Sequence, residues 1–182
     1  VGDSRYGARW YWERRYTLDS RPHEWYELSF DALRPAFEGL LRPEDRIVEL
    51  GCGTSRFAED ARQSGYASLV AVDFCEQLVQ TLRRRYPLGR YEAMDVTLLP
   101  GFEDGSVAGG FDKGTMDGLL GEGSSEDLKR ARLAAASISR VLRPGGHWVS
   151  VGVSAPEFFA SCLDDASGAL QLRSSRKLDP LP

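Results

Sequence analysis

Short apolar runs and longer amphipathic stretches alternate along most of this chain. The apolar runs end at glycine, proline or acidic residues and predict strands at 46–50, 69–73, 91–95, 110–114 and 147–153. Apolar positions spaced three or four residues apart predict helices at about 28–41, at 54–64, at 76–86 and from Ser125 as N-cap to Leu142. The Arg-Pro-Gly-Gly sequence at 143–146 should end the last helix. This order predicts an α/β fold with a doubly wound, mostly parallel sheet in a three-layer α/β/α sandwich.

The 182 residues are expected to form one domain, because no long linker, repeat or low-complexity tract precedes residue 160. Residues 1–41 would supply an N-terminal lid and helix, rich in aromatic residues and arginine. Residues 42–154 would form the sheet core, and residues 155–182 a polar tail.

Charge and composition argue against several classes of function. The formal charge of −4 and a pI near 5.3 give no broad positive surface for nucleic acid. No apolar stretch approaches the roughly 20 residues that cross a bilayer, so we expect no membrane partner. Cys52, Cys75 and Cys162 lack metal-ligand spacing and only two histidines are present, which predicts no metal site. We expect a reducing compartment, the cytoplasm, with the mitochondrion as the alternative.

The sequence Glu-Leu-Gly-Cys-Gly-Thr-Ser at 49–55 follows the first predicted strand, and Asp73 ends the second. Gly51 and Gly53 let the backbone pass close to a ligand at the carboxyl edge of a parallel sheet. Asp73, twenty residues past Gly53, can accept hydrogen bonds from both hydroxyls of a ribose. The pair therefore predicts an adenosine site.

Two features favour S-adenosylmethionine over a dinucleotide as the cofactor. A dinucleotide turn carries a third glycine, whereas this chain has Phe57 or Ala58 at that place. Glu49 is unfavourable beside a pyrophosphate but suits the ammonium group of an amino acid. An NAD-linked oxidoreductase is therefore the disfavoured reading.

The chain resembles class I S-adenosylmethionine-dependent methyltransferases in the glycine motif, in Asp73, in Asp95 and in the turn at 143–146. Within that class it is similar to the eukaryotic protein-lysine methyltransferases of elongation factors and citrate synthase. That narrower resemblance rests on three sequences: Tyr-Trp-Glu-Arg-Arg-Tyr at 11–16, Glu-Trp-Tyr at 24–26 and Phe-Asp-Lys-Gly-Thr-Met-Asp at 111–117. The matches cover residues 6 to about 158.

The resemblance implies a set of cofactor residues. The aromatic side chains would close over the cofactor, Asp73 and Phe74 would hold its ribose and adenine, and Asp95 and Val96 the adenine edge. Lys113 would lie at the inner end of the pocket and pair with the cofactor carboxylate or with Asp112. The full predicted set is Trp12, Tyr16, Trp25, Glu49, Gly51, Gly53, Asp73, Phe74, Asp95, Val96 and Lys113.

Plainer readings exist for some of these residues. We call the aromatic and arginine-rich segment at residues 6–26 the lead. Its aromatic side chains could be core anchors, and Asp112 with Lys113 could form a surface ion pair. Asp117 is better explained as a helix cap than as a catalytic group.

The expected reaction is in-line methyl transfer to a lysine of a protein substrate. An Asn-Pro-Pro-Tyr-like sequence is missing after the fourth strand, where Asp-Lys-Gly-Thr stands at 112–115. This argues against planar amino groups as acceptors and leaves an aliphatic amine, a carboxylate or a small hydroxyl compound. No catalytic base is assigned.

The tail departs from the pattern of this class, which normally ends with two more strands. After Ser154 only residues 169–173 have a strand pattern. Either the chain continues, or the sheet ends on an exposed edge that a partner covers. The alternative function is accordingly a methyltransferase-fold scaffold or interaction subunit of a larger assembly, with weak or no catalysis.

Overall fold

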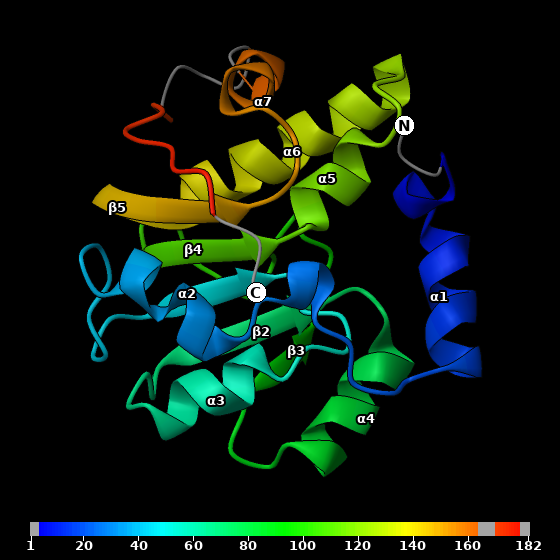
Figure 1. Ribbon diagram of the computed structural model, residues 1–182, viewed down its shortest axis with the longest axis vertical. Coiled ribbons are helices and arrows are strands. Elements are labelled where there is room, and N and C mark those ends of the chain that lie inside the picture. Colours follow the sequence, from blue (N-terminus) through cyan, green and yellow to red (C-terminus); the bar gives the residue numbers. More distant parts are fainter. Residues whose placement is uncertain (1–3, 164–169, 179–182) are drawn as a thin grey trace.

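The computed structural model describes residues 4–163 and 170–178, and its center is a five-stranded parallel sheet (Figure 1). The strands lie in the order β3-β2-β1-β4-β5. Their bounds are β1 Ile47–Leu50, β2 Leu69–Asp73, β3 Tyr91–Ala93, β4 Val107–Lys113 and β5 Leu142–Val151. The chain reverses its direction across the sheet between β3 and β4, so β1 and β4 meet at the topological switch point.

Helices cover both faces of the sheet, which confirms the predicted three-layer sandwich (Figure 1). Alternate residues of β1 pack to opposite sides: Ile47 joins the core beneath α2, α3 and α4, and Val48 joins the core beneath α6. Strands buried on both faces are continuous apolar runs, the pattern that made them visible in the sequence. The helices are α1 Arg9–Leu18, α2 Phe30–Phe37, α3 Phe57–Gln63, α4 Glu76–Arg85, α5 Thr115–Leu120, α6 Ser125–Val141 and α7 Pro156–Leu163.

Two short 3₁₀ segments complete the lead, η1 Ser4–Gly7 and η2 Trp25–Glu27. Tyr26 and Glu27 have φ angles of 61° and 57°, a left-handed conformation that L-residues rarely adopt. Within the described ranges no helix is both long and apolar enough to cross a membrane.

Several predicted boundaries were wrong. The helix expected at 28–41 spans 30–37, and the third strand stops at Ala93 instead of Asp95. The last strand begins at Leu142 and includes the Arg-Pro-Gly-Gly sequence, because a register shift between Val107 and Gly109 accommodates it against β4. The strand pattern at 169–173 was wrong for 170–173, which are irregular, and Ala169 lies outside the described residues.

Sequence periodicity missed α5 and α7, which are only six and eight residues long. It also placed the cap of α6 one residue late. Ser124 is the N-cap: its hydroxyl accepts a hydrogen bond from the backbone N–H of Asp127, whose side chain accepts one from the Ser124 backbone. This reciprocal pair is a capping box.

We predict that Ser124→Ala lowers the free energy of unfolding by about 1 kcal/mol, because it leaves helix N–H groups without a partner. Ser125→Ala, one residue later, is the matched control and should change stability much less. Urea unfolding followed by circular dichroism measures both. Equal losses for the two variants would refute the assignment of Ser124 as the cap.

Candidate functional site at the carboxyl edge of the sheet

The turns after β1, β2 and β4 meet at one edge of the sheet, where the sequence predicts the cofactor site. β1 pairs with both neighbours, so its glycine turn lies between Asp73 at the end of β2 and Lys113 at the end of β4. The aromatic lead reaches this edge from outside the sheet, since the Tyr16 hydroxyl approaches Gly53. The structure therefore brings most of the predicted residues to one region.

The glycine turn is held by neighbours on both sides. Gly51 has a φ of +63°, and a Cβ there would stand 2.3 Å from the Thr115 hydroxyl oxygen. That hydroxyl donates to the Leu50 carbonyl at 2.7 Å. Gly51 is thus required by contact with the chain itself, while the predicted close approach to a ligand remains a prediction. At Gly53, with a φ of +52°, a Cβ would stand 3.2 Å from the Tyr16 hydroxyl.

Asp73 connects two turns at this edge. Its buried carboxylate accepts hydrogen bonds from the Gly53 N–H at 3.1 Å and from the Cys75 N–H at 3.0 Å. Each oxygen retains a further lone pair, so these bonds leave capacity for a ribose hydroxyl. Burial raises the pKa of Asp73 to about 6, and the two backbone hydrogen bonds oppose that rise.

Lys113 departs from its predicted pairing. Its side chain is only 3% exposed, forms an ion pair with Glu24, and donates to the Leu28 carbonyl at 2.6 Å. The predicted Asp112–Lys113 pair was wrong, because successive residues of β4 point to opposite faces. Asp112 accepts instead from Trp148 Nε1 at 3.0 Å and from the Met116 N–H at 3.1 Å, and burial raises its pKa to about 7.

Glu24 anchors the lead to the sheet. Besides Lys113, its carboxylate accepts from the Ser55 hydroxyl at 2.8 Å and from the Arg56 N–H at 2.7 Å. The sequence motif at 24–26 contained this residue, but nothing local to it indicated partners 31 to 89 residues away. Glu24 is the main site residue that sequence reasoning missed.

Glu49 is unusual among the carboxyl groups of the site. It is 2% exposed in the middle of β1, and its Oε2 atom lacks a hydrogen-bond partner among the described residues. Burial raises the pKa of Glu49 to about 8, although the positive charge of Lys113 opposes the rise. A buried carboxyl without a partner is destabilising, and an ammonium group at this edge would supply the missing donor. The residues present therefore fit an amino-acid cofactor.

Aromatic rings of the lead stack on one another above this edge. The rings of Trp12 and Tyr16 are stacked with centroids 5.8 Å apart, and Trp12 and Trp25 meet edge to face at 6.0 Å. The Arg15 guanidinium lies 5.7 Å from the Trp12 ring and 5.5 Å from the Trp25 ring. These two rings thus already lie near a cation, and the same kind of contact would be favourable for a sulfonium.

The predicted adenine residues lie beside β3 and α1. Asp95 follows β3 by two residues and accepts from the Thr97 N–H at 2.9 Å and hydroxyl at 2.7 Å. The guanidinium group of Arg9, in α1, lies over Phe74 and near Asp95. It is 4.7 Å from the center of the Phe74 ring and 3.8 Å from an Asp95 oxygen. Val96 is partly buried and packs against the core beneath α6.

Asp117 does not cap a helix, since Gly114 is the N-cap of α5. Its carboxylate accepts from the Tyr26 hydroxyl at 2.6 Å, the Val153 N–H at 2.8 Å and the Ser154 hydroxyl at 2.8 Å. It therefore joins the lead, α5 and the segment after β5. The structure assigns no catalytic base, since the carboxylates of both Asp112 and Asp117 are already engaged.

Comparison with known proteins decides the family. A family model described as a methyltransferase domain matches residues 48–150, more than half of the chain. The chain belongs to the methyltransferase domain family. The matched segment begins inside β1 and ends inside β5, so it contains the glycine turn, Asp73, Asp95 and Lys113.

Individual curated proteins show a more specific similarity than the family model does. This methyltransferase domain is 39% identical to EEF1A lysine methyltransferase 4 of Bos taurus and 36% identical to that of Mus musculus, over 81% of this chain and 62% of each relative. It is 32% identical to eEF1A lysine and N-terminal methyltransferase of Danio rerio, over 78% of this chain and 20% of the relative. The chain thus spans about three fifths or less of the length of these relatives.

Solved structures share the fold. A TehB-like SAM-dependent methyltransferase from Corynebacterium glutamicum is 17% identical, with a TM-score of 0.57 over 85% of this chain and 78% of its own. The [4+2]-cyclase SpnF is 19% identical, with a TM-score of 0.53 over 67% of this chain and 50% of its own. A protein named for a different reaction shares the fold, so the fold alone does not fix the reaction.

We predict that this methyltransferase domain loses stability as the pH rises from about 4 to about 8. The pKa values of Asp73, Asp112 and Glu49 are raised to about 6, 7 and 8, so the folded chain holds protons that the unfolded chain releases in this range. Glu49→Gln should flatten the upper part of the decline, from about pH 6.5 to 8.

Urea unfolding at four pH values between about 5.5 and 8.5 measures this change. The exposed Glu122→Gln is the control, because it removes a carboxylate without altering a buried one. Parallel pH curves for wild type and Glu49→Gln would contradict the assignment of a raised pKa to Glu49.

Proposed function

We propose that this domain binds S-adenosylmethionine and transfers its methyl group to an amine of a protein lysine. The observation that carries the proposal is Glu49, a buried carboxyl with an unpartnered oxygen next to the glycine turn. The ammonium group of a methionine moiety satisfies that oxygen, whereas the pyrophosphate of a dinucleotide would be repelled by it. The membership in the methyltransferase domain family supports the same choice.

Different residues at the carboxyl edge of the sheet would bind different parts of the cofactor. Asp73 would accept from the ribose hydroxyls while it holds the Gly53 and Cys75 turns in place. Phe74 and Asp95 would contact the adenine, under the Arg9 side chain. Lys113 would act indirectly: it fixes Glu24, and Glu24 fixes the lead against the glycine turn.

When bound, S-adenosylmethionine supplies an electrophilic methyl group. The acceptor nitrogen forms a bond to the methyl carbon as the carbon–sulfur bond breaks, so alignment of the three atoms provides most of the rate. This chain would contribute alignment through the Trp12, Tyr16 and Trp25 rings, which also exclude water. The acceptor amine must lose its proton before attack, and a low-polarity aromatic environment promotes that loss by lowering the amine pKa.

The relatives support a protein acceptor. Two of them are named for lysine methylation of EEF1A, and a third for methylation of both lysine and the N-terminus of eEF1A. We therefore propose an elongation factor as the substrate class. We also propose the cytoplasm as its location, since translation factors act there.

We predict that Asp73→Asn weakens S-adenosylmethionine binding at least about tenfold, because charge-assisted hydrogen bonds to the ribose are lost. The amide keeps an acceptor for only one of the two turns, because its NH2 group faces the other backbone N–H, so circular dichroism must establish that the variant is folded. Asp73→Ala should abolish binding. Calorimetric titration with S-adenosylmethionine, S-adenosylhomocysteine and NAD measures these effects, with Glu122→Gln as the control. Normal binding by the folded Asp73 variants would refute the proposed ribose site, and binding of NAD would refute the choice of S-adenosylmethionine as the cofactor.

Methyl transfer needs a separate assay. We predict that the purified protein transfers labelled methyl groups to elongation factor 1A, and that mass spectrometry locates them on lysine. Modification of the N-terminal amine instead would contradict the proposed acceptor. Cofactor binding without any transfer to this factor would favour the scaffold function.

A further inference from the structure

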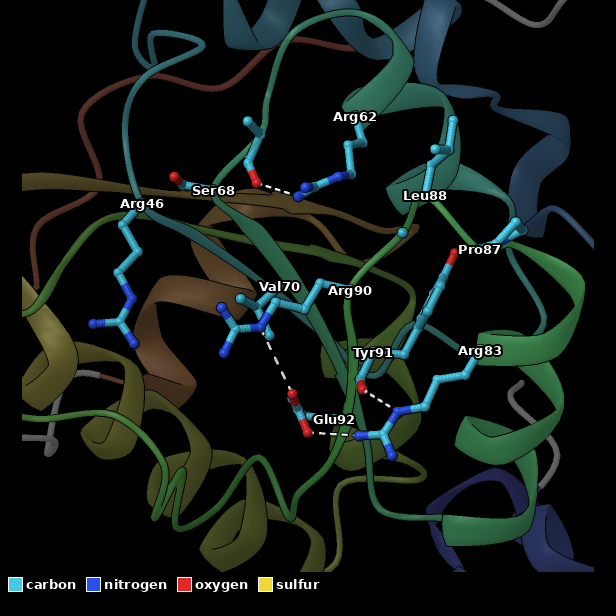
Figure 2. A pocket seen from close by; sticks show the side chains of 12 residues that line it. Arg46, Arg62, Ser68, Val70, Arg83, Pro87, Leu88, Arg90, Tyr91 and Glu92 are labelled. Atoms are coloured by element: carbon cyan, nitrogen blue, oxygen red, sulfur yellow. Dashed lines mark hydrogen bonds and ion pairs between the residues drawn. The ribbon is translucent and has the colours of Figure 1, made fainter.

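A cavity, drawn in Figure 2, is lined by residues at the amino edge of the sheet, the edge opposite the proposed cofactor site. Its volume is about 570 Å³, in the range of pockets that hold small ligands. Arg46, Ser68 and Arg90 each immediately precede a strand, β1, β2 and β3 respectively. These strands are parallel neighbours: Ile47 pairs with Leu69, so Arg46 and Ser68 start next to each other, whereas Tyr91 pairs with Ala71, so Arg90 starts beside Val70.

Four arginines line this cavity, and two of them form hydrogen bonds within the protein. Arg62 donates to the Ala67 carbonyl. Arg83 donates to the Tyr91 carbonyl at 2.8 Å and to a Glu92 oxygen at 2.6 Å, as the dashed lines in Figure 2 show. Both lie near the carboxyl ends of α3 and α4, where cations are favoured by the helix dipole.

The helix dipole does not account for Arg46 and Arg90, because these two residues precede strands. Among the described residues, the Arg46 guanidinium contacts only a ring face, 5.1 Å from the center of Phe102. Arg90 is 63% exposed at its side chain, and its Nε lies 3.6 Å from Glu92 Oε1, while Arg83 pairs with Oε2 of the same carboxylate. Both guanidinium groups therefore have N–H donors available, and Figure 2 shows them on the same side of the cavity, with the Ser68 hydroxyl apart from them.

The charge of the cavity is opposite to that of the whole chain. Four arginines and Glu92 give the lining a formal excess of positive charge, whereas the chain carries −4. Guanidinium groups match the tetrahedral oxygens of phosphate through paired N–H donors. The lining offers no exposed aromatic face for a base to stack on, since Tyr91 is 1% exposed. The chemistry thus selects the phosphate group and not a nucleobase.

We propose that this cavity binds a phosphate group, with Arg46 and Arg90 as its ligands. The phosphate belongs either to a small phosphorylated molecule or to a phosphorylated side chain of a protein, because both present the same oxygens. The site is separate from Glu49 and Asp73, so it can be occupied together with the proposed cofactor. Phosphate binding at this cavity requires no methyl transfer, so this proposal can be tested independently of the proposed function.

The test is calorimetric titration at low ionic strength with two probes. Inorganic pyrophosphate represents the small molecule, and a phosphoserine peptide, compared with its unphosphorylated form, represents the protein source. We expect one probe to bind in a 1:1 complex. Arg46→Gln and Arg90→Gln should each weaken it about tenfold, because each removes a charged donor, whereas Ser68→Ala at another part of the lining should change it little.

Arg84→Gln is the matched control, because it removes the same charge from an exposed position of α4 outside the lining. Circular dichroism establishes that each variant is folded. Preferential binding of pyrophosphate or of the phosphopeptide identifies the source. Loss of binding in Arg84→Gln equal to that in Arg46→Gln would overturn the site, since it would show a general charge effect. So would a folded wild type that binds neither probe at millimolar concentration.

Discussion

The buried ion pair between Glu24 and Lys113 determines how the rest of the site is arranged. Lys113 belongs to β4 in the center of the sheet, and Glu24 belongs to the lead that covers the carboxyl edge. A lysine buried without a partner would destabilise the fold strongly, so the lead cannot leave this position without cost. The same carboxylate binds Ser55 and the Arg56 N–H after the glycine turn. One acidic side chain thus joins three parts of the chain around the proposed cofactor.

The acidic groups around this pair are in unequal environments. Asp73 and Asp112 have donors for their carboxyl groups, from backbone N–H groups in one case and from Trp148 and Met116 in the other. Glu49 has one oxygen without a partner among the described residues, although it is just as buried. Structural carboxyls in a core are normally satisfied, so this difference is the observation that supports the proposed ligand contact at Glu49.

The sequence predicted what depends on local pattern and missed what depends on distant partners. The buried strands were visible because both faces of a parallel sheet are apolar, as at Val70 and Ala71. The six residues of α5 cover less than two turns, too few for a helical period to be recognised. The helix α1 buries none of its residues, so it has no apolar stripe. Lys113 was assigned to the cofactor carboxylate or to the adjacent Asp112, because no local signal indicates Glu24, 89 residues away.

The junction between the lead and α2 carries a conformational cost. Tyr26 and Glu27 are consecutive left-handed residues, and each costs on the order of 1–3 kcal/mol relative to an ordinary backbone conformation. The bond from the Tyr26 hydroxyl to Asp117 and the neighbouring Glu24 ion pair offset that cost only while the lead is docked. Undocking would release the strain but would also leave Lys113 without its ionic partner, so the lead resembles a strained latch whose docked state is favoured by less than its contacts alone would provide. Such a latch would let a cofactor as large as an adenosyl amino acid enter and leave without unfolding the sheet.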